Sequence, residues 1–243
     1  MGGRGASVRV QTGGSNTAST IQQIQAAAAN VVRNYTTMTD QQAQAIRDNV
    51  NQNYDIDTRL AIKQYISNAP DAQGYAMSQR LNYKLENNMP LKANEQYTHS
   101  VMQSAMHNLG QDTVLWRGGH DDILKSMGIN MKSLQGMTDS QLNAAMTGVT
   151  FSNKAYMSTS YDIKKNPFLS ASSGSGVSGG REVVLKINAP STTQVVFGAK
   201  NQSEIIIGVG QNMRVTGAHF TGKTATPRNR GAMRQIQLDI DFY

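Results

Sequence analysis

The sequence predicts an α+β fold in which an N-terminal helical layer is followed by two packed, mainly antiparallel β-sheets. Helix signals dominate residues 19–110, whereas short runs rich in β-branched residues dominate residues 111–243. The chain has 243 residues, which suits one domain with a sizeable core and is short for two. We therefore expect a single domain over residues 19–243, preceded by a tail at 1–18.

The N-terminal half carries recognisable helix starts. Residues 1–18 are rich in Gly, Ser and Thr without hydrophobic periodicity, which is typical of a flexible tail. Helical patterning begins at Ser19. Thr39 stands three residues before Gln42, as in a capping box that opens a helix. Further helices are expected over residues 58–67, 75–87 and 95–108.

Six segments of the C-terminal half have the composition of strands. They are TVLWRG (113–118), REVVLKI (181–187), TQVVF (193–197), SEIIIGV (203–209), MRVTGAHF (213–220) and RQIQLDIDF (234–242). Two short helices are expected among them, near residues 121–127 and 140–146. Thr138 and Gln141 form a capping box before the second.

Charge and cysteine content exclude several kinds of site. The chain carries 23 Lys and Arg against 16 Asp and Glu, a net charge of +7, which favours anionic partners such as a nucleotide phosphate, an acidic protein or a nucleic acid. It has no Cys, which excludes disulfides, thiolate metal sites and cysteine nucleophiles. The four His residues lack the spacing of metal ligands, so we expect no metal.

Hydropathy predicts a soluble protein. No apolar run approaches the roughly 18 residues of a membrane span, and the N-terminus lacks the apolar core of a secretory signal. We therefore expect a monomer without a membrane partner, exported only by a delivery device or by a route other than general secretion. Nucleic-acid binding is not indicated.

Two glycine-rich motifs match nucleotide-binding patterns, but their surroundings do not. Residues 217–224 (GAHFTGKT) fit a P-loop, yet Pro227 and Gly231 follow where its helix should begin. Residues 174–179 (GSGVSG) fit the dinucleotide fingerprint but precede a strand in place of a helix. We expect a loop between two strands in the first case. We expect the second motif to be a mobile loop, either a linker or a cover over a ligand.

Three further segments carry residue types that suit one chemistry. Arg117 stands in TVLWRGG, the triplet 158–160 in FSNKAYMSTS, and Gln202 and Glu204 in FGAKNQSEIII. An Arg presents a planar fork of donors that matches phosphate oxygens. A carboxylate fixed at the start of a strand stabilises developing positive charge. Each segment alone is a weak signal, so the weight lies in their combination.

In these three segments, and in their order, the sequence resembles the ADP-ribosyltransferase exoenzymes of the arginine-serine-glutamate class, which includes C3-like and binary-toxin enzymes. The resemblance takes in AIKQYISNAPDAQGYAMSQRLNYKLENN and covers about residues 55–240. It implies an enzyme that cleaves its substrate NAD and transfers ADP-ribose to a protein side chain. The opening MGGRGAS resembles those of some bacteriophage proteins, so we expect a phage or bacterial effector acting in the cytoplasm of a bacterial or infected host cell.

The resemblance implies a role for each residue of the centre. Arg117, with Gly118, would hold the pyrophosphate of NAD, and Glu204 would stabilise the cation formed as nicotinamide leaves. Ser158 would orient Glu204 and the ribose on the nicotinamide side. Thr159 is assigned to the NAD site beside it, although alternation along a strand turns its side chain to the other face.

Further contacts are expected around this centre. Phe168 would stack on the nicotinamide, and Lys164 and Lys165 would touch phosphate. Phe197 is either an aromatic that faces the target protein or a core residue of a strand.

One departure from the family concerns the helix before the catalytic Arg. Relatives often carry an Arg directly after its Leu, where it assists phosphate binding, whereas here Leu85 is followed by Glu86. Arg80 or Lys84 would substitute for it, with Asn82 of the same helix also in the NAD site.

Gln202 bears on the acceptor. Two residues before Glu204, it would share the face of Glu204 in an extended segment. Relatives with Glu at this position tend to modify arginine, whereas a neutral amide both donates and accepts hydrogen bonds. We therefore expect an Asn or Gln acceptor. Two other functions stay open: a NAD glycohydrolase with water as acceptor, and a basic, non-catalytic binding or structural protein with the same fold.

Overall fold

The computed structural model describes residues 33–67, 69–165, 181–226 and 231–243. All elements given below lie within residues 35–243, which form one unit of the structure. The predicted tail at 1–18, Phe168 and the glycine-rich motif at 174–179 lie outside the described residues.

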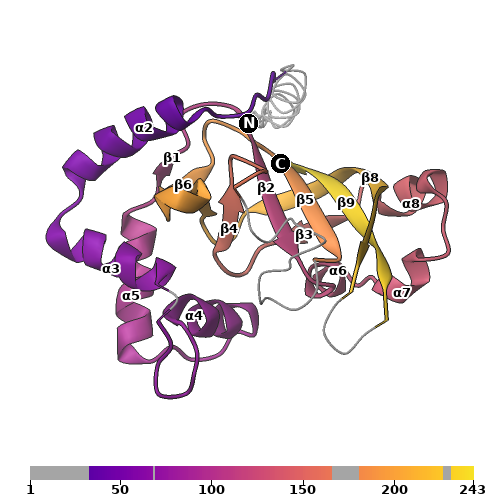
Figure 1. The fold of residues 1–243 in the computed structure, drawn as a ribbon. Coiled ribbons are helices and arrows are strands. Elements are labelled where there is room, and N and C mark those ends of the chain that lie inside the picture. Colours follow the sequence, from indigo (N-terminus) through magenta and orange to yellow (C-terminus); the bar gives the residue numbers. More distant parts are fainter. Residues whose placement is uncertain (1–32, 68, 166–180, 227–230) are drawn as a thin grey trace, which may run out of the picture. The chain divides into compact units, whose positions relative to one another are not determined.

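In the described part of the chain, four helices precede the first strand: α2 (Asp40–Asn53), α3 (Ile56–Ile66), α4 (Met77–Glu86) and α5 (Ala93–Ser104). They lie together on the left of Figure 1. The capping box predicted before α2 is confirmed, because the Thr39 hydroxyl accepts from the Gln42 N–H at 3.2 Å and the Gln42 side chain accepts from the Thr39 N–H at 2.9 Å. The Asp55 carboxylate caps α3 by accepting from the Thr58 N–H at 2.7 Å.

The helix predicted over residues 95–108 ends early, at Ser104. His107 and Asn108 instead form the short strand β1, which pairs antiparallel with β6. The pairing partner lies far along the chain, so local periodicity did not reveal it.

Nine strands of the described ranges form one sheet, in the order β1-β6-β7-β4-β2-β5-β9-β8-β3 (Figure 1). Besides β1, they are β2 (Thr113–Gly119), β3 (Thr150–Ser152), β4 (Met157–Ser160), β5 (Val183–Ala189), β6 (Gln194–Phe197), β7 (Glu204–Ile207), β8 (Asn212–Ala225) and β9 (Met233–Phe242). Neighbouring strands are antiparallel except β5 and β9, which are parallel. The predicted α+β, mainly antiparallel fold is confirmed.

Where the sequence predicted two packed sheets, the structure has one continuous sheet, whose halves β1-β6-β7-β4 and β2-β5-β9-β8-β3 meet where β4 pairs with β2. β4 and β2 join them through one residue pair, Ser160 with Trp116. β2 in turn pairs with β5 along its whole length. The strand order therefore runs from one half into the other through β4, which lies between β7 and β2.

The remaining helices follow β2: α6 (Asp122–Ser126), α7 (Met131–Leu134) and α8 (Asp139–Met146). The capping box of Thr138 and Gln141 opens α8 as predicted. Residues 217–224 lie inside β8, where Gly217 pairs with Asp239 of β9. They open no helix, which confirms that the motif is not a P-loop, although it is part of a strand and not a loop.

Two clusters of buried side chains pack against the sheet. Along β7, Ile205 and Ile207 belong to the larger cluster and Ile206 to the smaller one, as alternation along a strand predicts. The smaller cluster is completed from α3, α4 and α5 by Tyr65, Leu81 and Met102. By the same alternation, Glu204 shares the face of Ile206, the face that α3, α4 and α5 cover.

Two features are absent from the described ranges. None of the helices there is both long and apolar enough to span a bilayer. No group of three or more His, Asp or Glu side chains there is arranged to hold a metal ion.

Candidate active site

The loop between β6 and β7 fixes the carboxylate of Glu204. The Ala199 N–H donates to Glu204 Oε2 at 2.8 Å, and the Gly198 N–H donates to the Glu204 carbonyl at 3.0 Å. A Cβ atom at Gly198 would overlap Oε2 and stand 2.6 Å from Cδ, so glycine is what leaves room for this carboxylate. Glu204 is half-buried, and its Oε1 accepts no hydrogen bond from the residues described.

Gln202 lies in a turn and not in the extended segment that the sequence predicted. Residues 200–202 form a 3-10 turn, and Ser203 follows in the left-handed region with φ of 50°. The N–H groups of Ser203 and Glu204 both donate back into this turn at 3.1 Å. The expected alternation between Gln202 and Glu204 therefore does not apply. Gln202 is half-buried, and its carbonyl accepts the Ser160 hydroxyl at 2.9 Å.

Arg117 and Ser158 lie on adjoining strands. Arg117, followed by Gly118, is half-buried on β2, and its Nη1 donates to the Ser158 carbonyl on β4 at 2.9 Å. β4 pairs with β7 so that Ser160 is opposite Glu204, and Ser158, two residues earlier, shares that face. The three predicted segments therefore meet on three neighbouring strands.

Thr159, predicted to belong to the NAD site, has its side chain engaged inside the sheet. It is buried, and its hydroxyl donates to the Ile205 carbonyl at 2.7 Å, which commits it to the sheet. The Ser160 hydroxyl is likewise engaged, by backbone carbonyls at 2.9 Å. Within the described residues, Ser158 is the member of the triplet whose hydroxyl makes no hydrogen bond.

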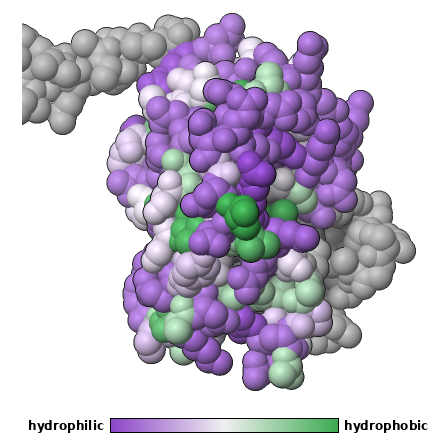
Figure 2. Space-filling view, turned by 90° about the vertical axis from the view of Figure 1, so that its left-hand side faces the viewer, coloured by the Kyte–Doolittle hydropathy of each residue, from purple (hydrophilic) through white to green (hydrophobic). Residues whose placement is uncertain are grey.

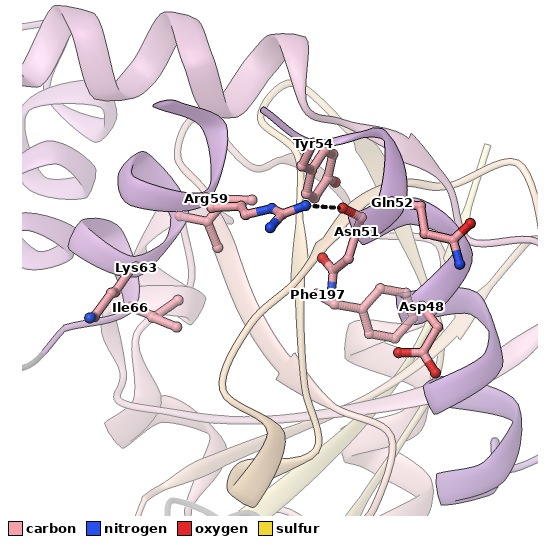
Figure 3. Close-up of a pocket in the computed structure, with 9 residues that line it drawn as sticks. Asp48, Asn51, Gln52, Tyr54, Arg59, Lys63, Ile66 and Phe197 are labelled. Carbon is pink, nitrogen blue, oxygen red and sulfur yellow. Dashed lines mark hydrogen bonds between the residues drawn. The ribbon is translucent and has the colours of Figure 1, made fainter. Parts of the chain in front are cut away.

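Phe197 is a core residue, the second of its two predicted roles. It is 8% exposed, and its ring stacks on His107 with ring centroids 5.7 Å apart. The Arg47 guanidinium covers it, with Cζ 5.3 Å from the ring centroid. Phe197 also borders a cavity of about 580 Å³ whose other walls come from α2, α3 and the residues between them (Figure 3). There Arg59 Nη2 donates to the Asn51 carbonyl at 2.8 Å.

The surface around α3 combines apolar and basic side chains. Ile56 and Leu60 are 75% and 57% exposed, and Arg59 and Lys63 border the cavity of Figure 3. Seen from the left of Figure 1, the molecule is mostly hydrophilic with a small apolar group near its centre (Figure 2).

Arg80 and Lys84, predicted to contact NAD, are instead committed to the fold. Arg80 pairs with Asp71, and its Nε donates to Glu95 Oε1 at 3.3 Å. Lys84 Nζ donates to Glu95 Oε2 at 2.6 Å. Because Glu95 is fully buried, both cations serve to neutralise it. Neither replaces the Arg that the family resemblance led us to expect.

Asn82 also acts through the interior. Its Nδ2 donates to Tyr65 Oη at 2.9 Å and to the Tyr156 carbonyl at 3.1 Å. Burial raises the pKa of Tyr65, and the charges of Arg117 and Glu204 act on this pKa in opposite directions. Tyr65 therefore lies within electrostatic reach of both site residues, and Asn82 is hydrogen-bonded to it.

Glu86 shares a cavity with Arg117. This cavity has a volume of about 520 Å³, and Asp122 and Tyr156 also line it. Burial raises the pKa of Glu86, and Asp122 raises it further, whereas Arg117 opposes the rise. A carboxylate thus shares this cavity with Arg117.

Arg181 is a residue near Arg117 that the sequence did not lead us to expect in the site. Burial lowers the pKa of its guanidinium, and the charge of Arg117 lowers it further, so the two cations are within electrostatic reach. Arg181 Nη1 donates to His120 Nε2, and His120 Nδ1 contacts Glu182 Oε2 at 2.7 Å. The available signal was its place directly after the glycine-rich segment, where REVVLKI begins.

Comparisons with known proteins converge on one family. The family model described as ADP-ribosyltransferase exoenzyme matches residues 13–240. Plx2a, an ADP-ribosyltransferase toxin from Paenibacillus larvae, has a similar structure, with a TM-score of 0.58 at 12% identity over 84% of this chain and 96% of that one. No curated protein sequence matches significantly.

Two C3 structures are similar to a comparable extent. C3stau2 from S. aureus, solved with NAD, gives a TM-score of 0.57 at 18% identity over 87% of this chain and 98% of that one. The C3 exoenzyme of Clostridium limosum gives a TM-score of 0.54 at 14% identity over 87% of this chain and 97% of that one. At these identities the likeness shows the fold.

Proposed function

The chain belongs to the ADP-ribosyltransferase exoenzyme family, and from this premise we propose that it transfers ADP-ribose to a neutral side chain of an acceptor protein. It is an NAD-dependent enzyme, with NAD as substrate. One observation carries the assignment of the site: Arg117, Ser158 and Glu204 lie on the neighbouring strands β2, β4 and β7. The hydrogen bond between Arg117 and the Ser158 carbonyl ties the first two together.

In this proposal Arg117 holds the pyrophosphate of NAD. The Ser158 carbonyl uses one of its donors, which leaves the rest of the guanidinium fork for phosphate oxygens. Glu86 and Asp122 in the same cavity repel phosphate but accept hydrogen bonds from ribose hydroxyls. Arg181 adds a second positive charge within reach of Arg117.

Glu204 stabilises the cation formed in the reaction. When the bond between ribose C1′ and the nicotinamide nitrogen breaks, its electron pair leaves with nicotinamide and positive charge develops on the ribose. The carboxylate is already held by the Ala199 N–H, and its Oε1 is available to a ribose hydroxyl. A preorganised group of this kind contributes about 3–4 kcal/mol to a transition state. The Ser158 hydroxyl, on the same face, positions the ribose.

Gln202 meets the acceptor. Its amide donates and accepts hydrogen bonds but carries no charge, which suits a neutral Asn or Gln side chain. The side-chain amide nitrogen of the acceptor attacks ribose C1′ and loses one proton to water. Arg47 and Lys200 both line a cavity beside the same loop, and their charges disfavour a cationic arginine acceptor.

The proposal is tested by incubating the protein with labelled NAD and a cell lysate and mapping the label by mass spectrometry. ADP-ribose on Asn or Gln is expected, and ADP-ribose on Arg would overturn the acceptor assignment. Nicotinamide release without any labelled protein would indicate a NAD glycohydrolase instead. Gln202→Ala should lower protein labelling about tenfold more than it lowers NAD hydrolysis, since the leaving group departs before the acceptor attacks.

A further inference from the structure

A cavity beside the catalytic loop carries an excess of positive charge. It has a volume of about 640 Å³ and lies between α2, the residues that follow β4 and the β6–β7 loop. We call it the α2 cavity; its lining includes Asp40, Gln44, Arg47, Tyr161, Lys165 and Lys200. It shares no lining residue with the cavity around Arg117.

Arg47 is a half-buried cation with unused donors. Its Nε and Nη2 are buried, and neither donates a hydrogen bond within the described residues. These two atoms form one edge of the guanidinium, the edge that a carboxylate meets with two parallel hydrogen bonds. The Phe197 ring lies against the group without supplying an acceptor of that kind. Buried donors without acceptors are unfavourable, so turning toward an acceptor stabilises Arg47.

The carboxylates nearby do not neutralise Arg47 by contact. Asp40 accepts from the Tyr161 hydroxyl at 3.0 Å and from Lys165 Nζ at 2.6 Å, which pairs this carboxylate with Lys165. In the described ranges neither Arg47 nor Lys200 has a carboxylate within ion-pair distance. Two cations of the lining are thus left for an anionic ligand.

More distant carboxylates reach Arg47 only through space. Asp48 on α2 and Glu204 on β7 attract it electrostatically without touching it. Lys200 and Asn201 of the lining belong to the turn that leads into Glu204, which places the α2 cavity beside the reaction centre. Lys200 lies in the same 3-10 turn as Gln202, so the cavity adjoins the side from which the acceptor approaches.

We propose that the α2 cavity binds a carboxylate of the acceptor protein, from an Asp or Glu near the modified residue, through Arg47 and Lys200. The inference rests on the proposed function, in which the acceptor meets Gln202. Binding requires the Arg47 side chain to turn its buried edge into the cavity, a change of rotamer. The bound carboxylate then compensates the two cations and sets the register of the acceptor segment against Gln202.

Calorimetry with a hexaglutamate peptide tests the site in the absence of NAD. Wild-type protein should bind it, and Arg47→Gln and Lys200→Gln should each weaken binding at least about fivefold. Lys63→Gln removes an exposed lysine at the cavity of Figure 3 and should bind like wild type. Hexaglutamine controls for charge, and thermal unfolding verifies that each variant is folded. Equal hexaglutamate binding by wild type and both cavity variants would overturn the proposal.

Labelling of lysate proteins from labelled NAD supplies the functional arm. Arg47→Gln should lower labelling about tenfold more than it lowers NAD hydrolysis, and Arg47→Lys, which keeps the charge without the fork, should recover part of the loss. A rise in the KM for NAD that accounts for the whole loss would assign the cavity to NAD and overturn the proposal. Wild-type protein inert toward NAD would overturn the proposed function instead, while the calorimetry would still decide whether the carboxylate site exists.

Discussion

The α4–α5 region and the β6–β7 loop each hold a carboxylate in place, but by opposite means. Glu95, in the first turn of α5, is fully buried and accepts from the Lys84 ammonium at 2.6 Å and the Arg80 guanidinium at 3.3 Å. Glu204 is half-buried, and within the described residues its carboxylate accepts only the backbone N–H of Ala199.

This difference separates a carboxylate that stabilises the fold from one that is available to a substrate. A carboxylate has about four acceptor positions. At Glu95, cations of the fold occupy these acceptor positions, so the charge of the carboxylate stabilises the folded state. Where the loop occupies one, as at Glu204, the others remain for a ligand. The same criterion separates Arg80, which is bound to two carboxylates, from Arg117, which among the described residues donates to a single backbone carbonyl.

The largest effect is expected at Glu204, the carboxylate that is available to a substrate. Glu204→Gln keeps the size of the side chain but removes its charge, so NAD cleavage should fall by about 10²–10³-fold. The melting temperature should stay close to that of wild type, because within the described residues no cation is paired with Glu204 by contact. Nicotinamide release and thermal unfolding measured on the same preparation decide the matter. Near-normal turnover would show that another group stabilises the cation.

At Glu95, the carboxylate that is paired with cations of the fold, a substitution should lower the stability of the folded state. Glu95→Gln leaves Arg80 and Lys84 without their buried counter-charge, and unfolding should become easier by about 3 kcal/mol, as measured by urea denaturation at neutral pH. The remaining folded protein should cleave NAD at a normal rate per molecule. A large loss of turnover without a loss of stability would break the distinction between the two regions.

The pH dependence of this stability has a defined sign. Burial acts to raise the pKa of Glu95, but hydrogen bonds from Lys84, the Lys92 N–H and Arg80 outweigh it, and the pKa is lowered from its ordinary value of 4.5. The folded state therefore gains stability from Glu95 above pH 4.5 and loses it as the pH falls through the lowered pKa. The difference between wild type and Glu95→Gln should accordingly shrink in acid.

The smallest of the expected effects concerns the position of the Glu204 carboxylate. Gly198→Ala places a Cβ where the Glu204 carboxylate now lies, and this flexible side chain must move aside. NAD cleavage should fall about tenfold because the carboxylate leaves its productive position, while the melting temperature changes little. Gly136→Ala is the matched control, since nothing lies within 4 Å of its added Cβ. Equal activity of both variants would show that the loop tolerates a displaced Glu204.

Much of the fold follows from signals that are local in the chain. The capping boxes at Thr39 and Thr138 each depend on a partner three residues away, so they were predicted and are present. Alternation along a strand likewise placed Ser158 and Ser160 on one face and Thr159 on the other. The order of the Arg, Ser and Glu segments was enough to identify the family.

The partners of the charged and hydroxyl side chains were decided only by the tertiary structure. Arg80 and Lys84 looked suited to phosphate, yet Glu95 on the next helix takes both. The left-handed conformation of Ser203 overturned the expectation that Gln202 and Glu204 share one face of an extended segment. A helix start depends on contacts within one turn. Whether a charged side chain is paired within the fold or can bind a ligand depends on burial and on residues that meet only after folding.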